Sequence, residues 1–128
     1  MKKILLPGTK LYLAGPMAGL EDHNFPAFNV AAEKLRLAGF EVLNPVEFDN
    51  TGCLEWADFL KRDIPYLLQC KAVAVLDGWW NSRGAKLETH IAAELGMPIY
   101  PVQMVLAFTY KSLNCLRCEG LKNSPPKV

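Results

Sequence analysis

Glu88 is the residue whose position most strongly suggests chemistry. Residues 83–95 have the spacing of an amphipathic helix that ends before Gly96. On a helical wheel Glu88 lies near the middle of the apolar arc, so its carboxylate is expected to face a sheet. Buried carboxylates are rare unless they are paired or functional, because burial disfavours the charged form. The pattern favours a functional Glu88. The alternative is a residue at the rim of the first helical turn, stabilised by the helix dipole.

The segment before this helix, residues 81–84 (Asn-Ser-Arg-Gly), has the composition of an anion site. Backbone N–H groups are free at a helix N-terminus, where they attract a phosphate or the hydroxyls of a sugar. The alternative is that Asn81 or Ser82 only caps the helix. Trp79 and Trp80 precede the segment, and their flat faces suit either a nucleobase or the protein core.

Tyr12 is the second candidate for chemistry. It lies near the end of a predicted strand, 10–14, with its hydroxyl beside the loop 15–19 (Gly-Pro-Met-Ala-Gly). The small residues of this loop would let a ligand approach the backbone closely. The loop is not a dinucleotide-binding fingerprint, because the G-x-G-x-x-G spacing is absent.

Two aspartates complete the set of candidate polar groups. Asp77 ends a continuous apolar run and is expected at the carboxyl end of a buried strand. Asp63 lies just before Pro65 in a predicted helix and could supply a second carboxyl group. The alternative for Asp63 is a solvated helix residue paired with Lys61 or Arg62.

Short strands and helices that alternate along the chain would position these side chains. Strands are predicted at 10–14, 40–43, 72–76 and 99–102. The first helix is expected to begin after its cap, Asn24, and to stop at Gly39. Further helices are predicted at 54–69, 83–95 and 104–116. Pro65 is expected to kink or shorten the second helix. This order predicts one α/β domain over 1–128, a Rossmann- or flavodoxin-like parallel sheet of four to five strands with helices on both faces. Its core would span about 10–101, with a flexible tail at 119–128.

In such sheets ligands bind at the carboxyl ends of the strands, near the switch in strand order. The loops 15–24, 44–52 and 77–84 are therefore expected to surround the site.

Composition excludes other classes of protein. The chain is 51% hydrophobic and 21% charged, as in globular domains. Its net charge of +1 argues against a duplex DNA partner, and no apolar run approaches the roughly 20 residues that span a membrane. We expect a soluble, cytoplasmic protein.

The four cysteines do not predict a disulfide framework. Cys53 and Cys70 are typical of small apolar residues in a reduced interior. Cys115 and Cys118 form a single C-x-x-C with no second pair of ligands nearby, which is weak evidence for zinc. We expect neither a metal nor an organic cofactor. A third reading is a structural subunit of a larger assembly that uses this C-terminal segment.

Two segments resemble a known enzyme family. Residues 11–16 (Leu-Tyr-Leu-Ala-Gly-Pro) and 82–88 (Ser-Arg-Gly-Ala-Lys-Leu-Glu) are similar to the nucleoside 2-deoxyribosyltransferases and the related deoxynucleoside 5′-monophosphate N-glycosidases. The likeness is strongest to short phage and bacterial proteins grouped beside them. In these proteins G-P-M-x-G-L and N-x-P-A-F recur, here at 15–20 and 24–28. The similarity covers about residues 10–101.

The resemblance implies roles for particular residues. Glu88 matches the nucleophile, Tyr12 the tyrosine that orients it, and Asp63 the aspartate that protonates the leaving base. Ser82 and the backbone of Gly84 match the group that holds the 5′ end of the sugar. The family also implies a homodimer. From the resemblance and the loops together, the residues expected to bind substrate are Gly15, Pro16, Met17, Asp77, Trp79, Ser82, Arg83 and Gly84.

These roles agree with the chemistry of an N-glycosidic bond. Its cleavage passes through an oxocarbenium-like transition state, which a carboxylate on one side and a proton donor beside the base stabilise. The expected activity is cleavage or transfer on a (deoxy)nucleoside or its 5′-monophosphate, through a covalent glycosyl-Glu88 intermediate. Hydrolysis of a nucleotide is slightly favoured, because 82–84 suits a phosphate. The alternative is a non-catalytic module of the same fold that binds a nucleotide or sugar phosphate.

Overall fold

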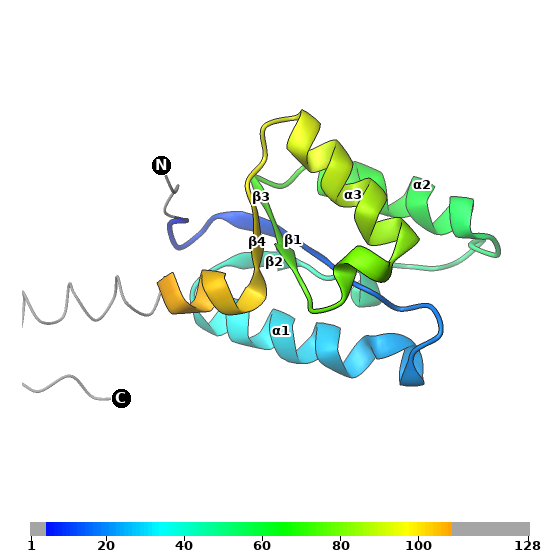
Figure 1. Cartoon of the computed structure of the whole chain (residues 1–128), viewed down its shortest axis with the longest axis horizontal. Coiled ribbons are helices and arrows are strands. Elements are labelled where there is room, and N and C mark those ends of the chain that lie inside the picture. The colour runs from blue at the N-terminus through cyan, green and yellow to red at the C-terminus, as the bar shows by residue number, and fades with distance from the viewer. Residues whose placement is uncertain (1–4, 109–128) are drawn as a thin grey trace, which may run out of the picture.

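A computed structural model describes residues 5–108 of the chain (Figure 1). Its strands are β1 (Lys10–Ala14), β2 (Glu41–Leu43), β3 (Ala72–Val75) and β4 (Ile99–Pro101). Its helices are α1 (Phe25–Leu37), α2 (Trp56–Leu67) and α3 (Arg83–Glu94), with short 3-10 turns η1 (Glu21–Asn24), η2 (Pro45–Glu47) and η3 (Trp79–Asn81). The last predicted helix begins two residues early, at 102, and is described to 108. Its remainder, Cys115, Cys118 and the tail 119–128 lie outside the described residues.

The four strands form one parallel sheet in the order β2-β1-β3-β4. The chain leaves β1 for β2 on one side and returns past β1 to add β3 on the other. The switch in strand order therefore lies between β1 and β3, where ligands of such folds bind. In the register of the sheet, Tyr12 pairs with Leu43 on one side and with Val73 on the other. Tyr12 thus occupies one of the two central strands, beside the switch point.

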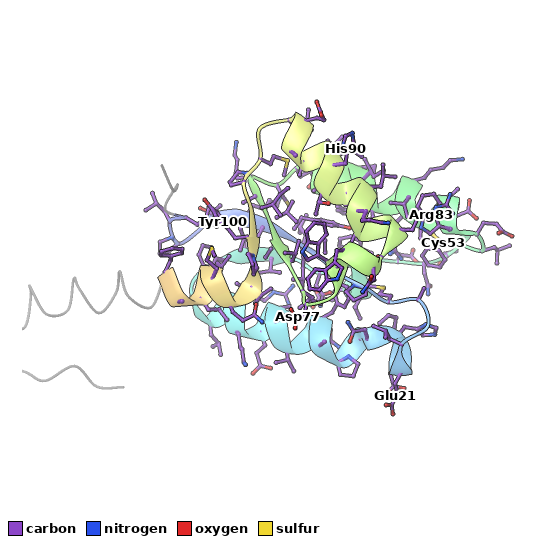
Figure 2. All side chains as sticks on the ribbon, viewed as in Figure 1. Glu21, Cys53, Asp77, Arg83, His90 and Tyr100 are labelled. Carbon is purple, nitrogen blue, oxygen red and sulfur yellow. The ribbon has the colours of Figure 1, made fainter. Side chains whose placement is uncertain are left out.

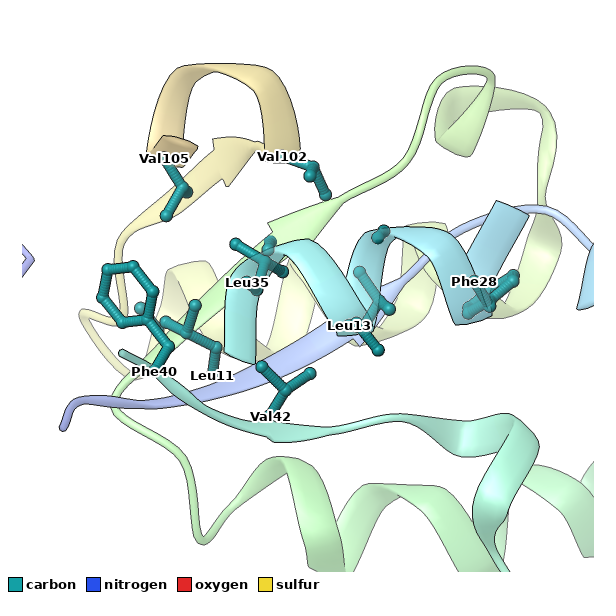
Figure 3. Packing of buried hydrophobic residues seen from close by; sticks show 12 residues of the cluster. Leu11, Leu13, Phe28, Leu35, Phe40, Val42, Val102 and Val105 are labelled. Atoms are coloured by element: carbon teal, nitrogen blue, oxygen red, sulfur yellow. The ribbon is translucent and has the colours of Figure 1, made fainter. Parts of the chain in front are cut away.

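Helices cover both faces of the sheet, which confirms the three-layer α/β prediction. Figure 1 shows α1 and the helix at 102–108 on one face and α2 with α3 on the other. Successive residues of β1 point to opposite faces, as the pleat of a strand requires. Leu11 and Leu13 pack on the α1 side with Phe28 and Leu35 (Figure 3), whereas Tyr12 packs on the α2–α3 side. All four residues of β3 are buried, because helices lie over both of its faces.

Two predictions at helix ends need correction or refinement. Asn24 is at the N-cap of α1, but its backbone is left-handed (φ 61°) and its side chain does not cap the helix. Its Nδ2 instead donates to the carbonyl oxygen of Pro16 at 2.9 Å, which ties the loop after β1 to the start of α1. Pro65 lies inside the last turn of α2, and this helix ends at Leu67, two residues earlier than predicted.

Gly15 is a glycine because the side chain of Leu76 fills the space that a Cβ would need. A Cβ on Gly15 would lie 2.8 Å from the Cβ of Leu76, closer than two such atoms can pack. We expect Gly15→Ala to lower the free energy of unfolding by about 1–3 kcal/mol, the usual effect of overpacking. Urea unfolding monitored by circular dichroism would measure the change.

Gly84→Ala is the matched control, since its added Cβ would meet its nearest neighbours at an ordinary 3.6 Å. An unchanged midpoint for Gly15→Ala would contradict the steric explanation.

Among residues 5–108, no helix is long and apolar enough to cross a membrane.

Candidate active site

The centre of the candidate site is a buried hydrogen bond between β1 and α3. The hydroxyl of Tyr12 donates to Oε2 of Glu88 at 2.6 Å, although the two residues are 76 positions apart. Tyr12 is fully buried and Glu88 is 6% exposed. The periodicity of α3 predicted a carboxylate that faces the sheet, and Glu88 lies there. His90 is on the exposed face of the same helix (Figure 2).

Asp63 of α2 joins this pair. It is 8% exposed, so the alternative of a solvated helix residue is wrong. The Nε of Arg62 donates to Oδ1 of Asp63 at 2.7 Å, which is the pairing that the same alternative anticipated. Asp63 also interacts with the Tyr12 hydroxyl and with the charge of Glu88. Three side chains from β1, α2 and α3 therefore meet at one point on the α2–α3 face of the sheet.

Burial sets the protonation of this cluster. It raises the pKa of Glu88 to about 8, and the charge of Asp63 adds to the effect, while the Tyr12 hydrogen bond and the charge of Arg62 oppose it. Burial likewise raises the pKa of Asp63, against the hydrogen bond and charge of Arg62. Burial and the neighbouring Glu88 hold the pKa of Tyr12 well above its ordinary value, so Tyr12 remains a donor. With a pKa of about 8, the carboxyl group of Glu88 is mostly neutral near pH 7.

The predicted anion segment has internal contacts of its own. Ser82 caps α3: its Oγ accepts from the backbone N–H of Ala85 at 3.1 Å. Arg83 is exposed (Figure 2), and its guanidinium lies 3.6 Å from the ring centre of Trp56 in α2. Gly84 is also next to Trp56 and Leu60. These contacts explain much of the segment without a ligand, and its part in substrate binding stays a prediction.

The other predicted binding residues do not all lie together. Asp77 is exposed in the loop after β3 (Figure 2). Trp79 is half-buried against the core on the α2–α3 side, whereas Trp80 is 55% exposed. Met17 packs against the core on the α1 side, the face opposite the Tyr12–Glu88 pair.

Pro16 lies beside Gly78 at the ends of β1 and β3. Gly15 packs against Leu76, which accounts for its lack of a side chain. The ends of these two strands are thus brought together at the switch point, next to the start of α3.

Comparison with known proteins now places the chain in a family. Residues 9–101 match the family model described as "Domain of unknown function (DUF4406)". The chain belongs to the DUF4406 family. The match spans every strand of the sheet and the three residues of the Tyr12, Asp63 and Glu88 cluster. No curated protein matches the sequence of this DUF4406 chain.

A solved structure shows what the DUF4406 fold is similar to. It is a 2-deoxyribosyltransferase from the psychrotolerant bacterium Bacillus psychrosaccharolyticus, described as a biocatalyst for the synthesis of nucleosides. The superposition has a TM-score of 0.54 at 24% sequence identity and covers 70% of this chain and 69% of the other. The likeness to 2-deoxyribosyltransferases inferred from two short segments is thereby confirmed at the level of the fold.

Sequence reasoning treated Arg62 of this DUF4406 domain only as a possible ion-pair partner. The structure shows its side chain to be 16% exposed and in contact with the cluster. Its place directly before Asp63 in the sequence was the available signal.

Among residues 5–108 no three His, Cys, Asp or Glu side chains come together in a way that could hold a metal ion.

The raised pKa of Glu88 predicts how the stability of the DUF4406 domain depends on pH. The folded state retains the proton up to about pH 8 and the unfolded state only to about 4.5, so the free energy of unfolding falls as pH rises between these values. We expect Glu88→Gln to remove that part of the slope. The native protein should lose on the order of 3 kcal/mol relative to the variant between pH 5 and 8. Urea unfolding of both proteins across this range measures it, and parallel curves would show that Glu88 ionises normally.

Proposed function

We propose that this protein is an enzyme that breaks the N-glycosidic bond of a nucleoside or nucleoside 5′-monophosphate, through a glycosyl-Glu88 intermediate. The observation that carries the proposal is the buried 2.6 Å hydrogen bond from Tyr12 to Glu88, with the carboxyl group of Asp63 beside it. The shared fold with a 2-deoxyribosyltransferase supports it. Cleavage of a glycosidic bond with retention requires two neighbouring carboxyl groups, one as the nucleophile and one as the acid.

The proposed reaction has two steps. Oε1 of Glu88, the oxygen that does not accept from Tyr12, attacks C1′ of the sugar. The bond from C1′ to the base nitrogen breaks, its electron pair goes to the base, and Asp63 delivers a proton there. Water, or a second base, then attacks C1′, loses a proton to the Asp63 carboxylate and releases Glu88 as a carboxylate. Attack by water makes the protein a hydrolase, and attack by a second base makes it a transferase.

The electrostatics favour the role of Asp63 and oppose that of Glu88. Raising the pKa of Asp63 favours the protonated form that an acid catalyst needs. Burial acts on Glu88 in the same direction, which opposes its role as a nucleophile, and the Tyr12 hydrogen bond counteracts this. A sugar that develops positive charge beside Glu88 would stabilise the carboxylate further.

Chromatography of reaction mixtures tests the proposal directly. The native protein is incubated with a panel of nucleosides and their 5′-monophosphates, with and without an added free base. Release of base without exchange would identify a hydrolase, and exchange would identify a transferase. A faster reaction of the 5′-monophosphates would support a phosphate site at 82–84. No turnover across the panel would contradict the proposal.

A second candidate function is a module that binds a nucleotide or sugar phosphate without turning it over. One observation favours it: with the pKa of Glu88 near 8, the neutral carboxyl predominates at pH 7 and donates a hydrogen bond instead of attacking. Such a module would keep its affinity when Glu88 is replaced by glutamine. Isothermal titration of both proteins with the panel separates this function from catalysis.

The proposal extends to the assembly and location of the protein. Cys53 and Cys70 are free thiols, which suits the reducing cytoplasm. A homodimer follows from the resemblance to the transferases. Light scattering coupled to gel filtration would measure the molar mass in solution against 14.3 kDa for one chain.

A further inference from the structure

Arg62 is held rigidly at the edge of the proposed site. Its Nε donates to Asp63, and its guanidinium carbon lies 5.4 Å from the ring centre of Phe48 and 5.2 Å from that of Phe59. Phe48 in turn stacks on Tyr66 with ring centres 4.1 Å apart. An arginine placed between aromatic faces and an ion pair loses most of its freedom to move. Its remaining donors therefore point in defined directions.

Those remaining donors are free. The ion pair uses the Nε–H, and within residues 5–108 no hydrogen-bond acceptor contacts either terminal amino group. In the same part of the chain no buried side-chain nitrogen or oxygen lacks a partner, so these amino groups must be open to solvent. The side chain of Arg62 is thus only 16% exposed, and its terminal N–H groups remain available as donors beside Asp63.

The positive charge of Arg62 acts on the whole cluster. It lowers the pKa of both Asp63 and Glu88, which places it within electrostatic range of the reacting groups. A cation would destabilise a sugar that becomes positive. It would stabilise a base that becomes negative, and Asp63, the next residue on the helix, is the group assigned to that base. The leaving base is therefore the part of the substrate that Arg62 can assist.

We propose that Arg62 binds the leaving base: its free amino groups donate to acceptor atoms of the base, and its charge stabilises the electron pair that the base receives. This inference rests on the proposed function. As the bond from C1′ to nitrogen breaks, its electron pair passes to the base. Arg62 stabilises the negative charge of the base until the proton from Asp63 neutralises that charge. The substrate class that follows is a base with a carbonyl oxygen or ring nitrogen exposed beside the glycosidic bond, because guanidinium donates and cannot accept.

A series of leaving groups tests this role. The base released by the native protein is compared with derivatives that carry electron-withdrawing substituents, such as uracil with 5-fluorouracil, whose nitrogen anions need less stabilisation. We expect Arg62→Gln to lower kcat/KM by about 10²–10³-fold for the parent base. The loss should shrink to less than tenfold for the most activated base. Arg62→Lys keeps the charge but loses the fork, and should recover part of the loss.

Arg83→Gln is the matched control, because it removes an arginine that also stacks on an aromatic ring but is exposed on α3. Its losses should not depend on the leaving group. An equal loss across the series for Arg62→Gln and Arg62→Lys, or no loss, would overturn the role of Arg62 while leaving the Glu88 mechanism intact. Absence of any turnover by the native protein would overturn both.

Discussion

Replacing Glu88 with glutamine is expected to abolish base release, with a fall in rate of about 10⁴- to 10⁶-fold. Glutamine preserves the shape of the side chain and can still accept from the Tyr12 hydroxyl, so the fold should be retained. It cannot form a stable ester with C1′, because an amide oxygen is a poor nucleophile. Chromatographic assay of released base against the native protein, under conditions of full saturation, measures the loss.

A covalent intermediate makes the Glu88 prediction sharper. Intact-mass spectrometry of the native protein, quenched during turnover of a 2′-fluorinated substrate that slows the second step, should show an added sugar. The Glu88→Gln protein should show none. Glu94→Gln, an exposed carboxylate on the same helix, should have native activity and the native adduct. Base release that survives in Glu88→Gln would exclude the covalent mechanism.

Asp63→Asn is expected to lower kcat/KM by about 10²–10⁴-fold and to change the shape of its pH profile. In the native protein the form that carries one proton on the Glu88–Asp63 pair is active. With two protons there is no nucleophile, and with none there is no acid, so the profile should be bell-shaped with a descending limb near pH 8. In Asp63→Asn only Glu88 titrates. Its activity should therefore rise with pH and then level off, without the descending limb.

The pH profile distinguishes an acid catalyst from a residue that only supports the fold. A structural role for Asp63 would lower activity by the same factor at each pH and leave a bell. Asp49→Asn is a suitable control, because Asp49 is exposed and its Oδ1 can still accept from Thr51 after the change. Its rate and profile should match those of the native protein.

Local patterns in the sequence were enough to predict the layers of this fold. The continuous apolar run of β3 and the order of strands and helices predicted a parallel sheet covered on both faces. The helical period of α3 predicted that Glu88 faces inward, because burial of a helix side chain follows from spacing along one element. Ser82 as a helix cap was likewise predictable, since a cap depends on residues three positions apart.

The protonation of the site and the residues that surround it depended on contacts between distant segments. Tyr12 and Glu88 meet across 76 residues, and Arg62 is aligned by the rings of Phe48 and Phe59. The packing of Met17 on the α1 side and the crowding of Gly15 by Leu76 are likewise contacts that the tertiary structure sets. The sequence by itself determined that Glu88 would be buried, because the burial of a helix side chain follows periodicity. Only the tertiary structure decided which charges they would meet, because desolvation and Coulomb energies depend on distances in space that spacing along the chain does not set.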